Sequence, residues 1–377
     1  DNNGVSGIEK SYDYELTTSN KQLKLSLDTE IQYLIRQELL KFQEIFNSYG
    51  SAAILMNVNN GEIFSMVSLP DFDLNKREDI SDKKFINRST KGVYELGSVF
   101  KTFTLAAGLQ QNVIQEDTLF KNLPKKIKCA GRSISEYDMD IPSSLTAEEI
   151  LIRSGNIGSI KIAQKVGLEN FKDFLENLDL LNKIQFDIEE VGNPIPFKWG
   201  KCKLATSAYG HGITTTPLQL AKAYAIIANG GYKIKPTLIK KEKNLKRGEQ
   251  IITQENSNKI NEILRKIVTS EQGTANLANI AGYEIAGKTG TAQKSIKGKY
   301  SKKKINTFAS IFPISSPKYV LIVLLDEPKL SETYIYEYND GKKRKIIGTP
   351  FNTAGWTSVE VAKNIIEKIG PILAIKY

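Results

Sequence analysis

The chain has 377 residues, of which 40% are hydrophobic and 25% are charged, and it carries a net charge of +10. These proportions are those of a globular protein with a sizeable core, and they exclude a disordered chain or a fibrous repeat. The basic charge would suit nucleic acid, an anionic membrane surface or an acidic substrate. The lysines are scattered, however, and their local concentration at 294–304 has no aromatic-and-basic nucleic-acid motif beside it, so we interpret this segment as a solvated loop.

The first part of the chain is predicted to form a helix and a β-hairpin. Asp28 or Thr29 caps the helix, whose apolar residues recur at helical spacing up to Phe46. Two β-rich runs within 51–70 flank Asn60-Gly61, a dipeptide that strongly predicts a hairpin turn. A polar lead-in at 1–27 precedes these elements, a polar connector at 71–97 follows them, and a helix then runs from about Ser98 to Gln111.

The middle of the chain is predicted to be helical. Thr146 and Glu149 have the spacing of a capping box, so one helix precedes the turn at 154–156 and a second helix follows it. Thr216 caps a further helix that has Pro217 at its first position. Another helix is expected at about 256–269.

The last third of the chain changes to strands. Three successive strands are predicted at 284–295, 305–314 and 318–328, and a helix of about 357–368 closes the chain. Helix, hairpin, helical insertion, strands and final helix together predict an α+β fold, in which one antiparallel sheet has helices on its faces.

Cysteine and histidine are too scarce for most metal chemistry. Cys129 and Cys202 lie far apart and form neither a disulfide framework nor a metal-ligand spacing, and whether they are free or paired stays open. With a single histidine beside them, zinc catalysis is not expected. His211 stands between two glycines, which favours a structural or turn role.

No apolar run approaches the roughly 18 residues that cross a bilayer. Because the chain begins at Asp1 rather than Met, we expect a processed or truncated product.

Ser98 and Lys101 stand three residues apart at a predicted helix start, so their side chains project from the same face. A serine hydroxyl is a poor nucleophile unless a base removes its proton. Lys101 is such a base only when it is neutral, and burial or a nearby second cation lowers the pKa of a lysine. Free backbone N–H groups at a helix start also suit a developing oxyanion. Alone the pair is weak evidence, since a capped, solvated helix start has the same pattern.

Two further short motifs contain groups that such a pair would need. Ser154-Gly155-Asn156, at the predicted helix–helix turn, offers a hydroxyl for proton relay and a carboxamide for a substrate amide, although this composition is ordinary for a turn. Lys288-Thr289-Gly290-Thr291, on a predicted strand, offers a second positive charge and two hydroxyls for a carboxylate. Gly290 would remove a side chain where a substrate backbone comes close, and a strand with a bulge is the plainer interpretation.

These three motifs, in this order and on a helix, a turn and a strand, are the set found in penicillin-binding proteins and serine β-lactamases. The chain resembles the transpeptidase domain of class B penicillin-binding proteins, and specifically the cell-division (septal) type. The blocks that match this family are GVSGIEKSYD (4–13), LSLDTEIQYLI (25–35), GSAAILMNVNNGEIFSMVSLPDFD (50–73), YELGSVFKTFT (94–104), SGNIGS (154–159), YGHGITTTPLQLAKAYA (209–225), GKTGTAQK (287–294), FASIFPISSPKYVLIVLLDEPK (308–329) and TAGW (353–356).

The resemblance implies peptidoglycan D,D-transpeptidation that needs no metal or organic cofactor. Ser98 would attack the carbonyl between two D-alanines, Lys101 would accept the serine proton, and Ser154 would relay a proton to the departing D-alanine. The implied catalytic residues are Ser98, Lys101, Ser154 and Asn156, of which Asn156 would bind the donor peptide backbone. The implied substrate-binding residues are Lys288, Thr289, Gly290 and Thr291, and the backbone N–H groups of Ser98 and Thr291 would form the oxyanion hole.

The resemblance also implies a five-stranded antiparallel sheet flanked by helices, with a helical subdomain. Residues 1–24 would be the remnant of an N-terminal pedestal or linker, and 25–377 the transpeptidase domain. The expected ligands are donor and acceptor stem peptides and β-lactam antibiotics, and the expected partners are a glycosyltransferase and divisome membrane proteins, with no nucleic acid. The expected location is the periplasmic face of the inner membrane, with an anchor upstream of this chain.

The chain departs from the family pattern at three places. Most of the family's pedestal is missing after Tyr14, Gly155 stands where a second serine is common, and the stretch 330–352 is polar and particular to this chain. These departures affect the expected partner surfaces more than the expected chemistry.

Two other functions stay open from the sequence. A serine β-lactamase shares the three motifs but needs a base for the deacylating water, which class A enzymes carry in a Glu-x-x-Leu-Asn context that this chain lacks. A β-lactam sensor or an inactive divisome scaffold would keep the fold, although the intact Ser98, Lys101, Asn156 and Lys288 argue against a decayed site. The preference for division over elongation rests on DEPK and TAGW near the C-terminus.

Overall fold

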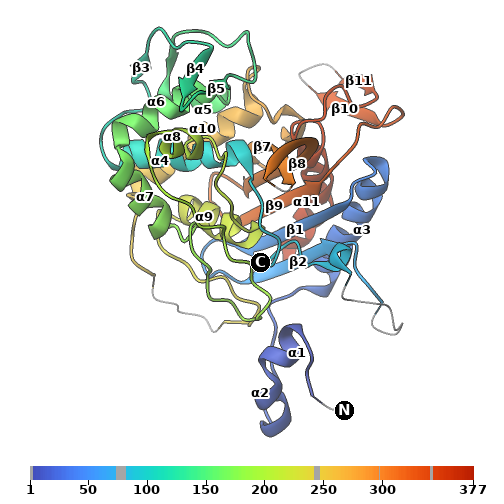
Figure 1. Cartoon of the computed structure of the whole chain (residues 1–377). Coiled ribbons are helices and arrows are strands. Elements are labelled where there is room, and N and C mark those ends of the chain that lie inside the picture. The colour runs from blue at the N-terminus through green and yellow to red at the C-terminus, as the bar shows by residue number, and fades with distance from the viewer. Residues whose placement is uncertain (1–2, 74–81, 242–246, 297, 340–342) are drawn as a thin grey trace.

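A five-stranded antiparallel sheet forms the centre of the molecule, with its strands in the order β2-β1-β9-β8-β7 (Figure 1). The strands are β1 (Gly50–Asn57), β2 (Ile63–Leu69), β7 (Ala286–Ile296), β8 (Lys299–Phe312) and β9 (Tyr319–Asp326). Residues 3–73, 82–241, 247–296, 298–339 and 343–377 are described by a computed structural model. The predicted α+β fold with a five-stranded antiparallel sheet is confirmed, and β7 lies at one edge of that sheet.

The strands β1 and β2 form the hairpin that Asn60-Gly61 predicts. Gly61 adopts a φ of +76°, a conformation that glycine reaches without strain. The register pairs Ser51 with Leu69 across the hairpin. On its other side β1 pairs with β9, whose residues are all buried. Such continuous burial is expected of a central strand that is covered on both faces.

Helices cover both faces of the sheet (Figure 1). The helices α3 (Thr29–Ile45) and α11 (Ser358–Lys376) pack together on one side, and α4 (Lys101–Gln110), α9 (Pro217–Ala228) and α10 (Gln254–Thr269) lie on the other. The Asp28 carboxylate caps α3, and Thr216 forms a capping box with Gln219 at the start of α9. The helix starts predicted from these local signals are therefore confirmed.

The final helix α11 extends to Lys376, well beyond its predicted end at about 368. Gly370 and Pro371 ordinarily end a helix, because proline lacks an N–H and cannot bond the carbonyl four residues earlier. Here the Tyr283 hydroxyl donates to that carbonyl, which belongs to Glu367, at 3.4 Å. A Cβ atom on residue 370 would lie 2.1 Å from the Tyr283 ring, so the glycine admits the ring. The predicted end was wrong because these contacts come from a distant segment.

A subdomain inserted between α4 and α9 contains the predicted middle helices and lies at the upper left of Figure 1. Its helices are α5 (Ala147–Ile152), α6 (Asn156–Val166), α7 (Leu168–Asn177) and α8 (Lys201–Ser207). The capping box of Thr146 and Glu149 is present at the start of α5, as predicted. The sequence did not predict its four short strands, of which β3 (Leu119–Phe120) pairs with β6 (Leu145–Thr146) and β4 (Lys126–Cys129) pairs with β5 (Arg132–Ser135).

A disulfide joins Cys129, at the end of β4, to Cys202 in α8, with the two Cα atoms 5.6 Å apart. The sequence indicated no disulfide framework, because the two cysteines are separated by 73 positions. The sequence left their pairing open, and the fold decides it by placing the β4–β5 hairpin beside the first turn of α8. The hairpin is thereby covalently tied to a helix far from it in sequence.

Short elements occupy the segments predicted to be polar and irregular. The lead-in holds α1 (Gly7–Ser11) and α2 (Asp13–Thr18), which bury no residue. The connector holds a 3₁₀ turn at Lys83–Phe85, and its residues 74–81 lie outside the described part of the chain. The stretch 330–352 holds the hairpin of β10 (Ile335–Asn339) and β11 (Lys343–Ile347), of which 340–342 are not described. A domain boundary after residue 24 stays a prediction.

Within the described ranges, no helix combines the length and the apolar character that crossing a membrane requires.

Candidate active site

Ser98 and Lys101 lie where a 3₁₀ turn, η2 (Gly97–Phe100), leads into α4. The predicted helix therefore begins as a tighter turn, and Lys101 is the first residue of the α-helix proper. Every residue of α4 from Lys101 to Leu109 is buried, so the helix is packed on all sides. Gly97 precedes the nucleophile candidate with a φ of +63°, which a side chain would strain. The turn that presents Ser98 thus depends on a glycine and on a rigid helix.

Two further glycines let neighbouring segments close on this turn. A Cβ atom on Gly290 of β7 would lie 2.2 Å from the carbonyl oxygen of Leu96, and one on Gly210 would lie 2.0 Å from that of Gly97. Both distances are far below ordinary contact, so each position requires glycine. The expectation was that Gly290 makes room for a substrate backbone. The structure shows that its missing side chain makes room for the turn that carries Ser98, and an approach of a substrate backbone stays a prediction.

Lys101 reaches the turn between α5 and α6. Its Nζ donates to the Ser154 carbonyl oxygen at 2.5 Å, to Asn156 Oδ1 at 2.7 Å and to Ser154 Oγ at 3.2 Å. Ser154 has a φ of +58°, a strained conformation for a residue with a side chain. Lys288 Nζ also donates to Ser154 Oγ, at 2.9 Å. The structure therefore brings the two lysines together on one hydroxyl.

Burial is the main influence on the pKa values of the two lysines. Lys101 is 2% exposed and Lys288 is 0% exposed. Loss of hydration lowers the pKa of Lys101 to about 7, and the negative charge of Glu136 opposes this shift. Burial, and secondly the charge of Lys101, lower the pKa of Lys288 well below its ordinary value. The sequence suggested Lys288 as the group that keeps Lys101 neutral. Burial is instead the main cause of the lowered pKa of Lys101. The repulsion between the two lysines lowers the pKa of Lys288.

The hydroxyls of the two threonines in the strand motif bond two different segments. Thr291 Oγ1 accepts a hydrogen bond from the backbone N–H of Ala354 at 2.9 Å. Thr289 Oγ1 shares a hydrogen bond of 2.6 Å with Thr274 Oγ1. These contacts fix both hydroxyls and bring the TAGW block beside β7.

One cavity of about 850 Å³ collects most of the predicted site residues, and its size suits a peptide-like ligand. The predicted residues that line it are Ser98, Lys101, Ser154, Asn156, Thr289 and Thr291. Lys288 lies buried beneath the lining, and Gly290 faces η2. Between described residues, no hydrogen bond joins Lys101 Nζ to Ser98 Oγ, because the lysine donates to Ser154 and Asn156. The catalytic and substrate-binding roles of these residues stay predictions.

The single histidine also lines this cavity. His211 stacks on Tyr300 with ring centroids 4.5 Å apart, and its Nδ1 lies 3.7 Å from Glu95 Oε2. Gly210 and Gly212 on either side both have positive φ angles, as a turn requires. Sequence reasoning identified the turn, but it had no signal for the contacts with Glu95 and Tyr300, which depend on tertiary structure.

Glu136 is a buried residue of the cavity lining that the sequence did not single out. It lies directly after β5, and no short motif marks it. Among the described residues, no three His, Cys, Asp or Glu side chains gather in a way that could hold a metal ion.

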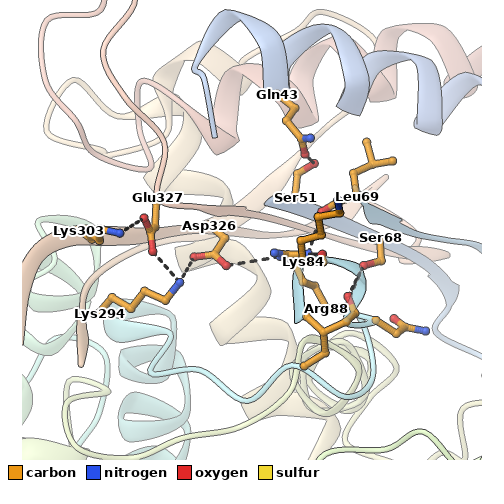
Figure 2. A network of polar contacts seen from close by, with 12 residues as sticks. Gln43, Ser51, Ser68, Leu69, Lys84, Arg88, Lys294, Lys303, Asp326 and Glu327 are labelled. Carbon is orange, nitrogen blue, oxygen red and sulfur yellow. Dashed lines mark hydrogen bonds and ion pairs between the residues drawn. The ribbon is translucent and has the colours of Figure 1, made fainter. Parts of the chain in front are cut away.

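A buried ion pair ties β9 to the connector that leads toward Ser98. Arg88 Nε donates to Asp326 Oδ2 at 3.4 Å, and Lys294 Nζ donates to Asp326 Oδ1 at 2.7 Å. Both contacts are drawn in Figure 2. The side chains of Arg88 and Asp326 are only 1% and 4% exposed. Asp326 therefore links the connector to β7, the strand that carries Lys288.

Most described residues of the lysine-rich segment 294–304 are exposed, as the sequence suggested, but they form strands and not a loop. Its described residues are the ends of β7 and β8. Lys294 bonds Asp326 and Glu327, and Lys303 forms an ion pair with Glu327 at 2.7 Å (Figure 2). The predicted loop was wrong because the partners of these lysines lie at the end of β9 and directly after it, remote in sequence.

Comparison with known proteins assigns this architecture. Residues 51–352 match the family model described as the penicillin-binding protein transpeptidase domain. The probable peptidoglycan D,D-transpeptidase FtsI of Caulobacter vibrioides is 31% identical over 388 residues, which span 99% of this chain and 63% of that protein. The peptidoglycan D,D-transpeptidase FtsI of Escherichia coli K12 is 29% identical over 364 residues, which span 89% of this chain and 61% of that protein. The chain thus covers less than two thirds of these relatives.

Solved structures have the same fold. The transpeptidase domain of Burkholderia pseudomallei penicillin-binding protein 3 superposes with a TM-score of 0.79 at 25% identity, covering 93% of this chain and 97% of that one. Penicillin-binding protein 3 of Mycobacterium tuberculosis gives a TM-score of 0.82 at 23% identity, covering 99% of this chain and 86% of that one. At this lower identity the likeness concerns the fold alone.

Proposed function

Because this chain belongs to the family of penicillin-binding protein transpeptidase domains, we propose that it is a serine-type peptidoglycan D,D-transpeptidase. It cross-links stem peptides during septal cell-wall synthesis and is inhibited covalently by β-lactams. One observation carries the proposal: Ser98 lines the same cavity as Lys101 and Ser154, and the buried Lys101 and Lys288 both contact the Ser154 hydroxyl.

Acylation begins when Ser98 Oγ attacks the carbonyl between two D-alanines. The serine proton passes to neutral Lys101, whose lowered pKa of about 7 makes it available as a base at physiological pH. The backbone N–H groups of Ser98 and Thr291 stabilise the oxyanion, and losing one such donor typically costs roughly 10²–10³ in rate. Collapse of the intermediate breaks the C–N bond, and the leaving D-alanine amine takes its proton through Ser154.

The position of β7 supports a site for the donor peptide. β7 is an edge strand of the sheet, so one side of its backbone is available to pair with an extended peptide. Thr289 and Thr291 line the cavity along this edge and fix the terminal carboxylate, with Lys288 supplying positive charge from beneath. Asn156 holds the peptide backbone from the opposite wall. The amine of a neighbouring stem peptide then attacks the acyl carbonyl and gives a proton to neutral Lys101. The new C–N bond forms as the ester bond to Ser98 breaks, and Lys101 passes that proton to the Ser98 oxygen.

The cellular setting follows from the same proposal. The domain works on the periplasmic side of the inner membrane, beside a glycosyltransferase and divisome membrane proteins. The Cys129–Cys202 disulfide supports this setting, because such bonds form and persist in oxidising compartments such as the periplasm.

The test is covalent labelling with a fluorescent penicillin, followed by mass spectrometry of the adduct. The expected result is one adduct per chain on Ser98, and none in Ser98→Ala. Labelling that persists in Ser98→Ala at another residue would overturn the assignment. Turnover of a chromogenic cephalosporin separates the alternatives: one stoichiometric burst supports a transpeptidase, and rapid multiple turnover indicates a β-lactamase.

A further inference from the structure

We propose that Glu136 is a positioning residue of this site: its carboxylate holds the first turn of α6, and through Asn156 it holds the Lys101 amine in place. This inference rests on the function proposed above, because it concerns how the lysine is presented to Ser98. Glu136 belongs to none of the three sequence motifs and lies directly after the short strand β5.

Both oxygens of the Glu136 carboxylate bond the start of α6. Oε2 accepts from the backbone N–H of Asn156 at 2.6 Å, and Oε1 accepts from that of Ile157 at 2.8 Å. Gly155 precedes the helix and has no side chain with which to cap it. The first N–H groups of a helix lack partners within the helix and favour a negative charge. Glu136, which is 7% exposed, therefore supplies from a distant segment the cap that the sequence lacks locally.

The residue beside Glu136 fixes the Asn156 side chain. Asn156 Nδ2 donates to the backbone carbonyl of Ser135 at 2.9 Å, and this contact turns Oδ1 toward Lys101 Nζ, 2.7 Å away. The reverse orientation would place an amide N–H against the lysine amine. Two adjacent residues, Ser135 and Glu136, thus determine where the backbone of Asn156 lies and which way its amide points.

Glu136 also supplies negative charge close to the lysine. Burial lowers the pKa of Lys101, and the charge of Glu136 raises it. The other charged side chains around this cavity are Asp138, Arg153 and Lys304 in its lining and Lys288 beneath it. A neutral residue at 136 would leave burial unopposed, so Lys101 would lose its proton at a lower pH.

The segment that carries Glu136 is anchored at a second point. β5 pairs with β4, and the end of β4 is joined by the Cys129–Cys202 disulfide to α8. The chain beyond α8 reaches Gly210, which packs against the carbonyl of Gly97 beside the nucleophile. Glu136 therefore directly follows a hairpin that is tied to the segment packed against the turn beside Ser98.

The test compares Glu136→Gln with wild type and with Asp140→Asn, an exposed carboxylate on the same segment outside the cavity lining. The second-order rate constant for acylation by a penicillin is measured from about pH 4.5 to pH 9, together with the melting temperature. Glu136→Gln is expected to acylate about 10- to 100-fold more slowly, because small displacements of reacting groups have large effects. The limb in which the rate rises with pH is expected to move to lower pH, whereas Asp140→Asn should match wild type in both.

An unchanged rate and pH profile in Glu136→Gln would overturn the proposal. So would a slower rate that comes with a lower melting temperature and an unmoved pH limb, since that pattern indicates a purely structural role. If wild type forms no adduct at Ser98, the proposed function fails, and Glu136 is then judged by NMR titration of isotopically labelled Lys101. In that measurement the lysine must titrate at a lower pH in Glu136→Gln than in wild type, and equal titration would reject the inference.

Discussion

Lys101 and Lys288 share one hydrogen-bond acceptor, the hydroxyl of Ser154, at 3.2 Å and 2.9 Å. Two buried ammonium groups that share one acceptor repel each other, and burial removes the hydration of both. The state in which both lysines are protonated is therefore disfavoured. Ser154, whose hydroxyl meets both amines, has a positive φ in the turn between α5 and α6. The strain at Ser154 and the burial of two lysines are costs to stability that a site built for proton transfer would retain.

The first prediction concerns the pH dependence of acylation. Lys101 accepts a proton only when neutral, and its pKa is lowered to about 7. The acylation rate is therefore expected to rise through about pH 7 and to level off above it, because the base is lost as pH falls through its pKa. Stopped-flow acylation by a chromogenic cephalosporin measures this profile. A rising limb near the ordinary lysine pKa, or no limb at all, would contradict a buried lysine base.

The second prediction concerns the stability cost of Lys288. In the unfolded chain this lysine binds a proton below its ordinary pKa of 10.5, whereas burial lowers its pKa in the folded protein. The unfolded state therefore binds more protons as pH falls from 10.5, and folding loses stability over that range. Lys288→Met removes this effect and is expected to raise the free energy of unfolding by about 0.5–2 kcal/mol near neutral pH while abolishing acylation.

Urea denaturation at pH 7.5 and at pH 10 tests this sign. The gain from Lys288→Met should shrink at the higher pH, where the lysine of the unfolded chain begins to lose its proton as well. Lys299→Met replaces an exposed lysine on β8 and serves as the control, with no gain expected at either pH. A gain that is the same at both pH values would show that packing, and not proton binding, is responsible.

The third prediction concerns the buried pair of Arg88 and Asp326. Asp326→Asn leaves the Arg88 guanidinium buried without its counter-charge, which typically costs about 3–5 kcal/mol. Lys303→Ala removes the Lys303–Glu327 ion pair, whose lysine is 55% exposed, and is expected to cost less than about 1 kcal/mol. Urea denaturation of the two variants checks the contrast. Equal small losses would mean that Arg88 finds another partner when Asp326 loses its charge.

Most of the fold could be predicted from local sequence signals. The features that could not be predicted depend on contacts between segments that are remote in sequence. Asn60-Gly61 and Thr216-Pro217 determine a turn and a helix start within a few residues, so the hairpin and α9 were predictable. The continuation of α11 past Pro371 was not, because it depends on Tyr283, which is remote in sequence. The spacing of residues in the sequence predicts where elements begin and end, but it does not predict which elements contact each other.

The candidate site shows the same division. Ser98, Lys101 and Ser154 could be found because each belongs to a short motif, and the structure places all three around one cavity. Glu136 has no motif, and its partners Asn156 and Ile157 lie on a helix that begins only after a further strand and helix. The Lys288 charge effect was assigned to the wrong member of the pair, because burial of each amine cannot be read from sequence.

The fourth prediction concerns Gly290, whose missing side chain lets β7 pack against the turn that carries Ser98. Gly290→Ala would place a Cβ atom 2.2 Å from the Leu96 carbonyl oxygen, and therefore pushes β7 away from the turn that carries Ser98. We expect acylation to fall about 100-fold, because the nucleophile is displaced from its partners. Gly200→Ala is the matched control, since nothing lies within 4 Å of its Cβ position and its φ of 174° is ordinary extended backbone. Similar acylation rates in the two variants would show that the turn and the strand are not tightly coupled.

The fifth prediction concerns the Cys129–Cys202 disulfide. The bond closes a loop over a separation of 73 positions, for which the chain-entropy account gives a stabilisation of about 4 kcal/mol. Reduction should therefore lower the urea midpoint of the wild-type protein, and the double variant Cys129→Ser/Cys202→Ser should have the lower midpoint with or without reductant. Because the bond also holds the hairpin that precedes Glu136, reduction should slow acylation of wild type and leave the double variant unaffected. A wild-type protein that shows two titratable thiols after reduction, with an unchanged midpoint and acylation rate, would mean that the hairpin is held by its packing alone.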